Sequence, residues 1–252
     1  PVITRAVRNG RRISLGAEAA SRADAMFLAE VAQRAEECGA SRIRFADTLG
    51  VLDPFTTFEA VARLRDAVEM DIEIHTHNDM GLATANTLAA LRAGATHANT
   101  TVNGLGERAG NAALEEVVMA VRHLHHAETG VDTQALVPIS HLVAKASGRA
   151  VAFNKSIVGS AVFTHESGIH IDGLMKNAST YESFDPSELG RSRSTVLGKH
   201  SGSHAVRQAS ALLGVVLDDD QLVGRLLART PEHAIPLKPE ATADERHSAL
   251  VD

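Results

Sequence analysis

The sequence has no tryptophan, one tyrosine and one cysteine among its 252 residues, and aromatic residues make up only 3%. Such a chain has to build its core from Ala, Val, Leu and Ile, as helix-rich α/β proteins do. The single cysteine, Cys38, excludes an intramolecular disulfide framework. We therefore expect a cytoplasmic protein in which Cys38 is a packed thiol at the end of a helix.

Two further absences exclude whole classes of partner. No apolar run is long enough to span a bilayer, and no segment resembles a signal peptide. The formal net charge is -6, so the chain offers no basic surface to nucleic acid or to an anionic membrane. We expect neither a membrane nor a nucleic acid as partner.

Repeated βα units fill the first half of the chain. Each unit is an extended apolar segment followed by a helical pattern, and each is about thirty residues long. The extended segments begin near Ile13, Ile43, Ile72 and His97. The pair Asp53-Pro54 predicts the start of one of the helices. The alternation predicts a parallel sheet, either an open doubly wound sheet or part of a (β/α)8 barrel.

Polar residues at the ends of the predicted strands favour the barrel, because a barrel gathers its active site there. They are Glu18, Thr48, His75, His77 and either Asn103 or Asn111. No Gly-x-Gly-x-x-Gly motif follows the first strand, as a dinucleotide-binding sheet would require. A complete barrel needs about 250 residues, whereas only four units precede residue 127. We therefore expect the second half of a barrel.

The pattern changes after residue 127. Residues 128–132 predict a loop, and residues 136–149 predict another helix. The stretch 153–204 is rich in Gly, Ser and His and has no sustained period. Irregular polar segments of this kind often carry function. The last residues, from Pro236, are charged, and we expect them to be frayed.

His75 and His77 lie two positions apart in the run Glu-Ile-His-Thr-His. Because side chains alternate along a strand, both imidazoles point to one face and can reach one divalent cation. Glu73 shares that face and can support these ligands from behind. The pair alone fits equally well with two imidazoles that face solvent or the core.

Four runs give the chain a resemblance to a known family. They are residues 75–79 (His-Thr-His-Asn-Asp), 102–111 (Val-Asn-Gly-Leu-Gly-Glu-Arg-Ala-Gly-Asn), 163–173 and 197–202 (Leu-Gly-Lys-His-Ser-Gly). From about Ile13 to Arg207 the chain resembles the metal-dependent acyl-CoA condensing synthases, which include 2-isopropylmalate synthase and homocitrate synthase. Within this group it looks most like the homocitrate synthase associated with nitrogen fixation, on less specific details such as Ile171.

The resemblance implies a (β/α)8 TIM barrel followed by small, mostly helical linker subdomains, in a homodimer. Residues 1–127 would then be the C-terminal half of the barrel, 128–210 the linker subdomains that contribute to the partner's active site, and 211–252 a helical tail. The family's Arg-Asp-Gly-Glu-Gln motif, which supplies a metal-binding Asp and a catalytic Arg, does not occur in the sequence. We therefore expect the N-terminal half of the barrel to be missing from this chain.

The implied activity joins acetyl-CoA to a 2-oxo acid and then hydrolyses the thioester, and 2-oxoglutarate would give homocitrate. By resemblance, His75, His77 and Asn111 bind a divalent cation, with Mg or Mn favoured. Thr48 would contact the substrate carboxylate, and Glu73 is expected with Thr48 in the substrate-binding site. Asn111 could cap the following helix, alone or together with a metal-binding role, and Thr48 could satisfy backbone groups at its strand end.

The acid–base residues also come from the resemblance. Glu18 and His170 would remove a proton from the acetyl methyl group, and Tyr181 would donate or orient a proton. His170 and Tyr181 would act across the dimer. Tyr181 could also be an ordinary packing residue. The loop 104–107 would line the entrance for coenzyme A, with Arg108 bracing it.

Two competing functions stay open. One is another synthase of the group, for 2-isopropylmalate or citramalate, which would accept a different 2-oxo acid. Isopropylmalate synthases usually carry a long C-terminal leucine-sensing domain, and this chain ends about fifty residues after Gly202, which favours homocitrate. The other is a non-catalytic, truncated subunit that dimerises without turnover.

Overall fold

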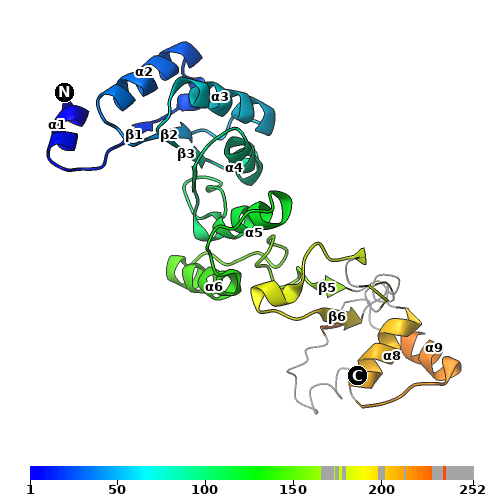
Figure 1. Cartoon of the computed structure of the whole chain (residues 1–252). Coiled ribbons are helices and arrows are strands. Elements are labelled where there is room, and N and C mark those ends of the chain that lie inside the picture. The colour runs from blue at the N-terminus through cyan, green and yellow to red at the C-terminus, as the bar shows by residue number, and fades with distance from the viewer. Residues whose placement is uncertain are drawn as a thin grey trace. The chain divides into compact units, whose positions relative to one another are not determined.

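The computed structural model describes residues 1–165, 173, 176–177, 180–197, 202–212, 214–228 and 235–236. The chain divides into two compact units, Pro1–Val151 and Ala152–Asp252. The α-helices and most of the strands of both units are labelled in Figure 1. Each unit is described by itself below.

A four-stranded parallel sheet forms the centre of the first unit. Its strands are β1 (Ser14–Ala17), β2 (Arg42–Asp47), β3 (Asp71–Thr76) and β4 (His97–Asn99), and they lie side by side in the order of the sequence. Because βα crossovers are right-handed, an order that never reverses places every crossover helix on the same face of the sheet. A doubly wound sheet reverses its order and carries helices on both faces. The observed order is the one that a barrel requires.

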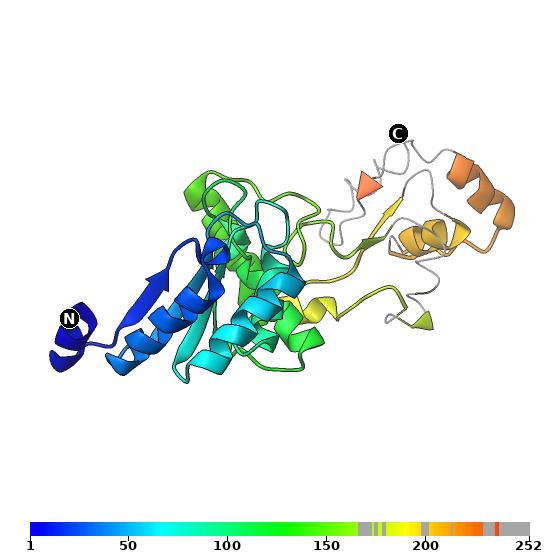
Figure 2. The ribbon, with the colours of Figure 1, turned by 90° about the horizontal axis from the view of Figure 1, so that it is seen from above.

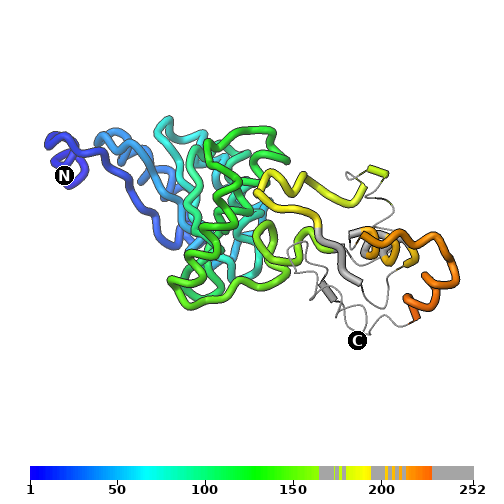
Figure 3. Tube along the Cα trace, turned by 90° about the horizontal axis from the view of Figure 1, so that it is seen from below, coloured from blue at the N-terminus to red at the C-terminus, as the bar shows by residue number. Residues whose placement is uncertain are grey.

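The helices alternate with the strands up to β4, and the last two helices of the unit follow it without a further strand between them. The helices are α1 (Val2–Arg8), α2 (Ala25–Glu37), α3 (Pro54–Ala67), α4 (Ala83–Arg92), α5 (Leu114–Leu124) and α6 (Leu136–Ser147), with 3-10 turns η1 (Ala20–Arg22), η2 (Val102–Gly104) and η3 (Thr133–Ala135). Figure 2 shows α2 and α3 side by side along the sheet. The alternating path can be followed from blue to green in Figure 3.

The predicted start of α3 is confirmed. The Asp53 carboxylate accepts hydrogen bonds from the backbone N–H groups of Phe55 and Thr56, at 2.8 and 3.0 Å. The Thr56 hydroxyl in turn accepts from the Asp53 N–H at 3.1 Å, which completes a capping box with Pro54 at the first helical position. A cap of this kind stabilises a helix by about 1 kcal/mol.

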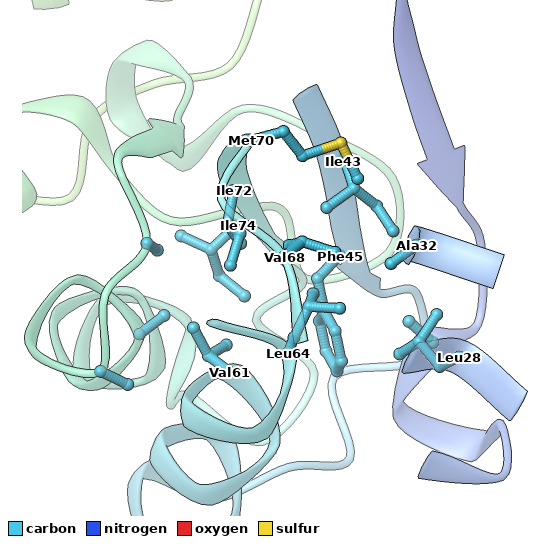
Figure 4. Packing of buried hydrophobic residues seen from close by; sticks show 14 of the residues in the cluster. Leu28, Ala32, Ile43, Phe45, Val61, Leu64, Val68, Met70, Ile72 and Ile74 are labelled. Carbon is cyan, nitrogen blue, oxygen red and sulfur yellow. The ribbon is translucent and has the colours of Figure 1, made fainter. Parts of the chain in front are cut away.

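The hydrophobic core lies between the sheet and its helices. Alternate residues of β2 and β3 point into it, and helices α2 and α3 cover them (Figure 4). The buried side chains are Leu28, Ala32, Ile43, Phe45, Val61, Leu64, Val68, Met70, Ile72 and Ile74. Burying one such large apolar side chain stabilises the fold by about 1.5–3 kcal/mol. The core thus holds one face of the sheet against the helices.

The other face of the sheet is polar. It carries Arg42, Arg44, Glu73, His75, His97 and Asn99. The strand register places Arg44 beside Glu73, Glu73 beside His97, and His75 beside Asn99. In a barrel this face would point inward, so the site residues are held on the inner side of a rigid sheet.

The second unit combines short strands with helices. Strand β5 (Thr164–His165) pairs in parallel with β6 (Ser194–Leu197), which pairs antiparallel with β7 (Ile235–Pro236). The 3-10 helix η5 (Pro186–Leu189) precedes β6, and helices α8 (Ser203–Leu212) and α9 (Asp220–Ala228) follow it. The rings of Phe163 and Phe184 pack edge to face, with their centroids 5.5 Å apart. The Arg191 guanidinium lies 5.2 Å from the centroid of the Phe163 ring.

The predicted parallel α/β sheet and the predicted helix after residue 136 are confirmed. The structure places η3 and α6 in the same compact unit as the sheet. The functional division of the chain after residue 127 stays a prediction. Within the described part of the chain, no helix combines the length and the apolar character needed to cross a bilayer.

Candidate active site

His75 and His77 lie at the C-terminal end of β3. Their ring centroids are 4.9 Å apart, with an angle of 81° between the ring planes. Thr76, between them, is buried on the helix side, where its hydroxyl bonds to the Ala83 carbonyl and the Thr87 hydroxyl. The strand therefore directs both imidazoles to the polar face, as the two-residue spacing predicted.

Asn111 reaches His77 through the backbone. The two residues form an isolated antiparallel bridge, and the Asn78 N–H donates to the Gly110 carbonyl at 2.9 Å. The sequence left Asn103 as the alternative at this position. However, Asn103 donates to the Ser140 carbonyl at 2.9 Å and accepts from its hydroxyl at 2.5 Å. Of the two asparagines, Asn111 is therefore the one that lies beside His77.

The Asn111 side chain does not cap α5, because the N-cap residue is Ala113 and makes no side-chain cap bond. Its Nδ2 donates to the Leu105 carbonyl at 3.2 Å, while Oδ1 is buried without a partner. Nδ1 of His77 is also buried without a partner. A buried polar atom without a partner costs about 1–3 kcal/mol. A bound cation would give these two atoms a partner, and the residues that carry them are neighbours in the backbone bridge.

The donor set suits a divalent cation with mixed nitrogen and oxygen ligands. His75 and His77 can supply imidazole nitrogens, and Asn111 an amide oxygen. Within the described residues, no cluster of three or more His, Cys, Asp or Glu could hold a metal ion by itself. A cation held by His75 and His77 would therefore need a further ligand, and the amide oxygen of Asn111 can supply one.

A glycine-rich loop wraps around the Asn111 side chain. A Cβ on Gly106 would lie 2.5 Å from Asn111 Nδ2, and a Cβ on Gly110 would collide with the Gly104 carbonyl. Gly110 also has a φ of 93°, which glycine adopts without strain. Glycine at these two positions lets the loop close over the amide.

Nδ1 of His75 contacts a side chain on the polar face of the sheet. It lies 3.1 Å from Asn99 Oδ1. Asn99 Nδ2 donates to Glu73 at 3.1 Å, and Arg42 donates to the other Glu73 oxygen at 2.9 Å. Glu73 thus lies behind His75, to which it is connected through Asn99. Burial, helped by the nearby His77, lowers the pKa of His75, which favours the neutral ring that binds metals.

Glu18 and Thr48 lie together where β1 and β2 end. Arg44 donates to Glu18 Oε1 at 2.7 Å, and the Thr48 hydroxyl donates to Oε2 at 3.4 Å. The same hydroxyl accepts from the Ala19 N–H at 2.8 Å, so Thr48 does satisfy a backbone group. The Glu18 side chain is 61% exposed. A carboxylate held in place and open to solvent can accept a proton from a bound molecule.

Arg108 joins two strand-end loops. It donates to both Asp79 oxygens, at 2.7 and 2.9 Å, and to the Thr48 carbonyl at 2.6 Å. The hydrogen bond from Arg108 lowers the pKa of Asp79. A Cβ on Gly50 would lie 2.9 Å from both Asp79 Oδ2 and the His77 carbonyl. Arg108 braces its loop as predicted, but the sequence analysis assigned no role to Asp79.

The remaining predicted residues belong to the second unit. Tyr181 is 38% exposed, and its ring lies so close to Gly173 that a Cβ there would collide with it. His170 lies outside the described residues. The action of Tyr181 and His170 at the site of the first unit stays a prediction.

Comparison with known proteins connects these residues to a family. The HMGL-like family model matches residues 1–143, and the model for a homocitrate synthase post-HMGL domain-like region matches residues 157–230. The match to the first model covers more than half of the chain. Both compact units therefore correspond to known families.

Two relatives match almost the whole chain. 2-isopropylmalate synthase 2 of Caldanaerobacter subterraneus subsp. tengcongensis is 52% identical over 233 residues, covering 92% of this chain and 60% of the relative. Homocitrate synthase 1 of Nostoc sp. is 49% identical over 243 residues, which cover 96% of this chain and 64% of that synthase. The chain thus spans about three fifths of the length of these curated relatives.

Among solved structures, hydroxymethylglutaryl-CoA lyase from Pseudomonas aeruginosa matches with a TM-score of 0.53 and 26% identity. The match covers 64% of this chain and 57% of the lyase. An α/β TIM-barrel domain with a parallel sheet is therefore followed by a post-HMGL domain. The chain belongs to the HMGL-like family and is a homologue of the homocitrate and 2-isopropylmalate synthases.

Proposed function

We propose that the protein condenses acetyl-CoA with a 2-oxo acid and then hydrolyses the thioester of the product. The observation that carries this proposal is the set His75, His77 and Asn111, which includes two buried polar atoms without partners. The set lies at the end of a parallel strand, where barrel enzymes of many kinds hold their catalytic residues. The HMGL-like family match supports the same conclusion.

The metal site accounts for the binding of the 2-oxo acid. A divalent cation, Mg or Mn, held by His75, His77 and Asn111 would act as a Lewis acid on the keto carbon when bound. Thr48 already orders its hydroxyl between the Ala19 N–H and Glu18. We assign this hydroxyl to the carboxylate of the 2-oxo acid.

The condensation needs a base at the acetyl methyl group. We propose that Glu18 and His170 remove this proton, with Glu18 aligned by Arg44. The methyl carbon then forms a bond to the keto carbon, whose oxygen takes up a proton donated or oriented by Tyr181. Water cleaves the thioester, which leaves a carboxylate and the free thiol of coenzyme A. His170 and Tyr181 act on the partner's site in a homodimer.

We propose 2-oxoglutarate as the 2-oxo acid and homocitrate as the product, in the context of nitrogen fixation. Two relatives support this choice, since the homocitrate synthases of Nostoc sp. and Frankia alni are each 49% identical to the chain. The 52% identical 2-isopropylmalate synthase 2 favours 2-oxoisovalerate as the alternative substrate. Pyruvate, which would give citramalate, is the third 2-oxo acid to test.

The proposed function also assigns a role to each segment of the chain. We propose that residues 1–127 act as the C-terminal half of the TIM barrel, that 128–210 are linker subdomains reaching the partner's active site, and that 211–252 form a tail. The strand order and the polar strand ends of the first unit support the first assignment. The cytoplasmic location also stays a prediction.

The test is the release of thiol from acetyl-CoA with Mn or Mg, in the presence of 2-oxoglutarate, 2-oxoisovalerate or pyruvate. We expect turnover with 2-oxoglutarate once the chain is joined to a barrel half that carries the Arg-Asp-Gly-Glu-Gln motif, which the sequence itself lacks. In that protein we expect His75→Ala and His77→Ala to abolish turnover. His141→Ala, which removes an exposed imidazole of α6, is the matched control. Preference for 2-oxoisovalerate would move the assignment to isopropylmalate synthase. No turnover by a folded, metal-binding protein would favour a non-catalytic subunit.

A further inference from the structure

A chain of hydrogen bonds crosses the polar face of the sheet and ends on His75. It starts at Arg42 on β2, continues through Glu73 on β3 and Asn99 on β4, and returns to His75 on β3. The register places the Asn99 residue directly beside His75. These hydrogen bonds therefore link three neighbouring strands and do not depend on one flexible loop.

Chemistry fixes the direction of every bond in this chain. A guanidinium group only donates and a carboxylate only accepts, so Arg42 Nη1 donates to Glu73 Oε2 at 2.9 Å. Because Glu73 Oε1 also accepts, Asn99 has to present Nδ2 to it, at 3.1 Å. This leaves Asn99 Oδ1 facing His75, at 3.1 Å from Nδ1. An amide oxygen accepts only, so Nδ1 of His75 carries the proton.

We propose that Asn99 is a positioning residue which, oriented by Glu73 and Arg42, fixes the His75 tautomer. In this tautomer the proton is on Nδ1 and the lone pair is on Nε2. A neutral imidazole binds a metal through its unprotonated nitrogen. The hydrogen bonds from Asn99, Glu73 and Arg42 therefore leave Nε2 as the nitrogen of His75 that is available to the cation. This inference rests on the proposed role of His75 as a metal ligand.

The anchor of the chain is rigid. Arg42 also donates through Nη2 to His97 Nε2, at 2.6 Å. His97 Nδ1 therefore carries a proton, which it donates to the Thr96 hydroxyl at 2.8 Å. The side chains of Arg42 and Glu73 are only 25% and 14% exposed. Charge-assisted bonds that are sheltered in this way are stronger than neutral or exposed ones.

A single isosteric substitution should reverse the direction of the hydrogen bonds that link Glu73, Asn99 and His75. In Glu73→Gln, Arg42 can bond only to the amide oxygen, so the amide nitrogen of the new side chain has to face Asn99. Asn99 must then turn its oxygen to that nitrogen and its own Nδ2 to His75. Nδ1 of His75 would become the acceptor, and the proton would move to Nε2. The shape of the site would be kept while its metal-binding nitrogen is blocked.

The experiment is long-range 1H–15N NMR of the histidine side chains in the metal-free protein, at a pH where His75 is neutral. We expect the proton of His75 on Nδ1 in the native protein and on Nε2 in Glu73→Gln. Asn99→Ala should give a mixture of the two forms. Glu182→Gln, which changes another arginine-paired carboxylate in the second unit, should leave His75 unaltered.

A double variant tests the role of Arg42. In Arg42→Met/Glu73→Gln no guanidinium fixes the glutamine, which can present either its oxygen or its nitrogen to Asn99, so the Nδ1 tautomer should reappear beside the Nε2 form. Mn2+ binding, followed by EPR, should weaken about 10–100-fold in Glu73→Gln and Asn99→Ala. The double variant should bind Mn2+ more tightly than Glu73→Gln and less tightly than the native protein, and an affinity equal to that of Glu73→Gln would contradict the role of Arg42.

The two proposals can fail separately. A proton on Nε2 in the native protein, or a folded Glu73→Gln protein with an unchanged tautomer, would overturn the positioning role. The native measurement alone decides the matter if Glu73→Gln does not fold. A correct tautomer in a native protein that binds no Mn2+ would instead reject the proposed metal site, because the tautomer is measured without metal.

Discussion

His77 and Asn111 form an antiparallel backbone bridge, and each brings a buried polar side-chain atom that has no hydrogen-bond partner. His77 follows β3, whereas Asn111 lies in the loop before α5. The bridge fixes the distance between their backbones before any ligand binds. A site assembled in this way is preorganised, so the cation does not have to order the loop.

Removal of the Asn111 amide tests the donor set. We expect Asn111→Ala to weaken Mn2+ binding at least about tenfold, because the oxygen that is removed has no other partner. The free energy of unfolding should fall by only about 1 kcal/mol, for the lost bond to the Leu105 carbonyl. EPR and urea denaturation measure the two effects. Unchanged Mn2+ affinity would remove Asn111 from the site.

The loop around Asn111 can be tested by adding one methyl group. A Cβ at position 106 would lie 2.5 Å from Asn111 Nδ2, so we expect Gly106→Ala to displace the amide and weaken Mn2+ binding. Gly224→Ala is the matched control, since a Cβ on this helical glycine meets nothing within 4 Å. Equal Mn2+ affinity of the two variants would contradict the packing described.

The pair Asp79–Arg108 should make stability depend on pH. Arg108 lowers the pKa of Asp79 in the folded protein, so the unfolded chain binds more protons as the pH falls. The resulting stability is present above the unfolded pKa of about 3.9 and is lost as the pH falls through the folded value.

The measurement is urea denaturation at several pH values. Asp79→Asn should reduce the loss of stability in acid, because its side chain no longer titrates. Asp66→Asn, at an exposed position of α3, should keep the acid slope of the native protein. If Asp79→Asn showed the same slope as Asp66→Asn, the ion pair would not contribute to the acid sensitivity.

Two phenylalanines distinguish the core from the surface. Phe45 is 1% exposed between the sheet and the helices, whereas Phe55 is 81% exposed at the start of α3. We expect Phe45→Ala to lower the free energy of unfolding by about 3–5 kcal/mol. Phe55→Ala should change it by no more than about 0.5 kcal/mol. Urea denaturation followed by circular dichroism compares the two, and similar losses would contradict the buried face assigned to β2.

Local patterns in the sequence were enough to predict several elements. The apolar segments near Ile43 and Ile72 became β2 and β3, and Asp53 caps α3. His75 and His77 share a face because the side-chain period of a strand is two, whatever surrounds it. These features depend on neighbours in the sequence, and the sequence alone therefore determined them.

Contacts between distant segments could not be predicted in the same way. The sequence left Asn103 and Asn111 as alternatives, and it gave no sign that Asn99 and Arg42 lie behind His75. These contacts depend on the register of three parallel strands. Register is a relation between segments about thirty residues apart, which no local period encodes. The residue types of the candidate site were thus determined by the sequence, and their partners and orientation by the tertiary structure.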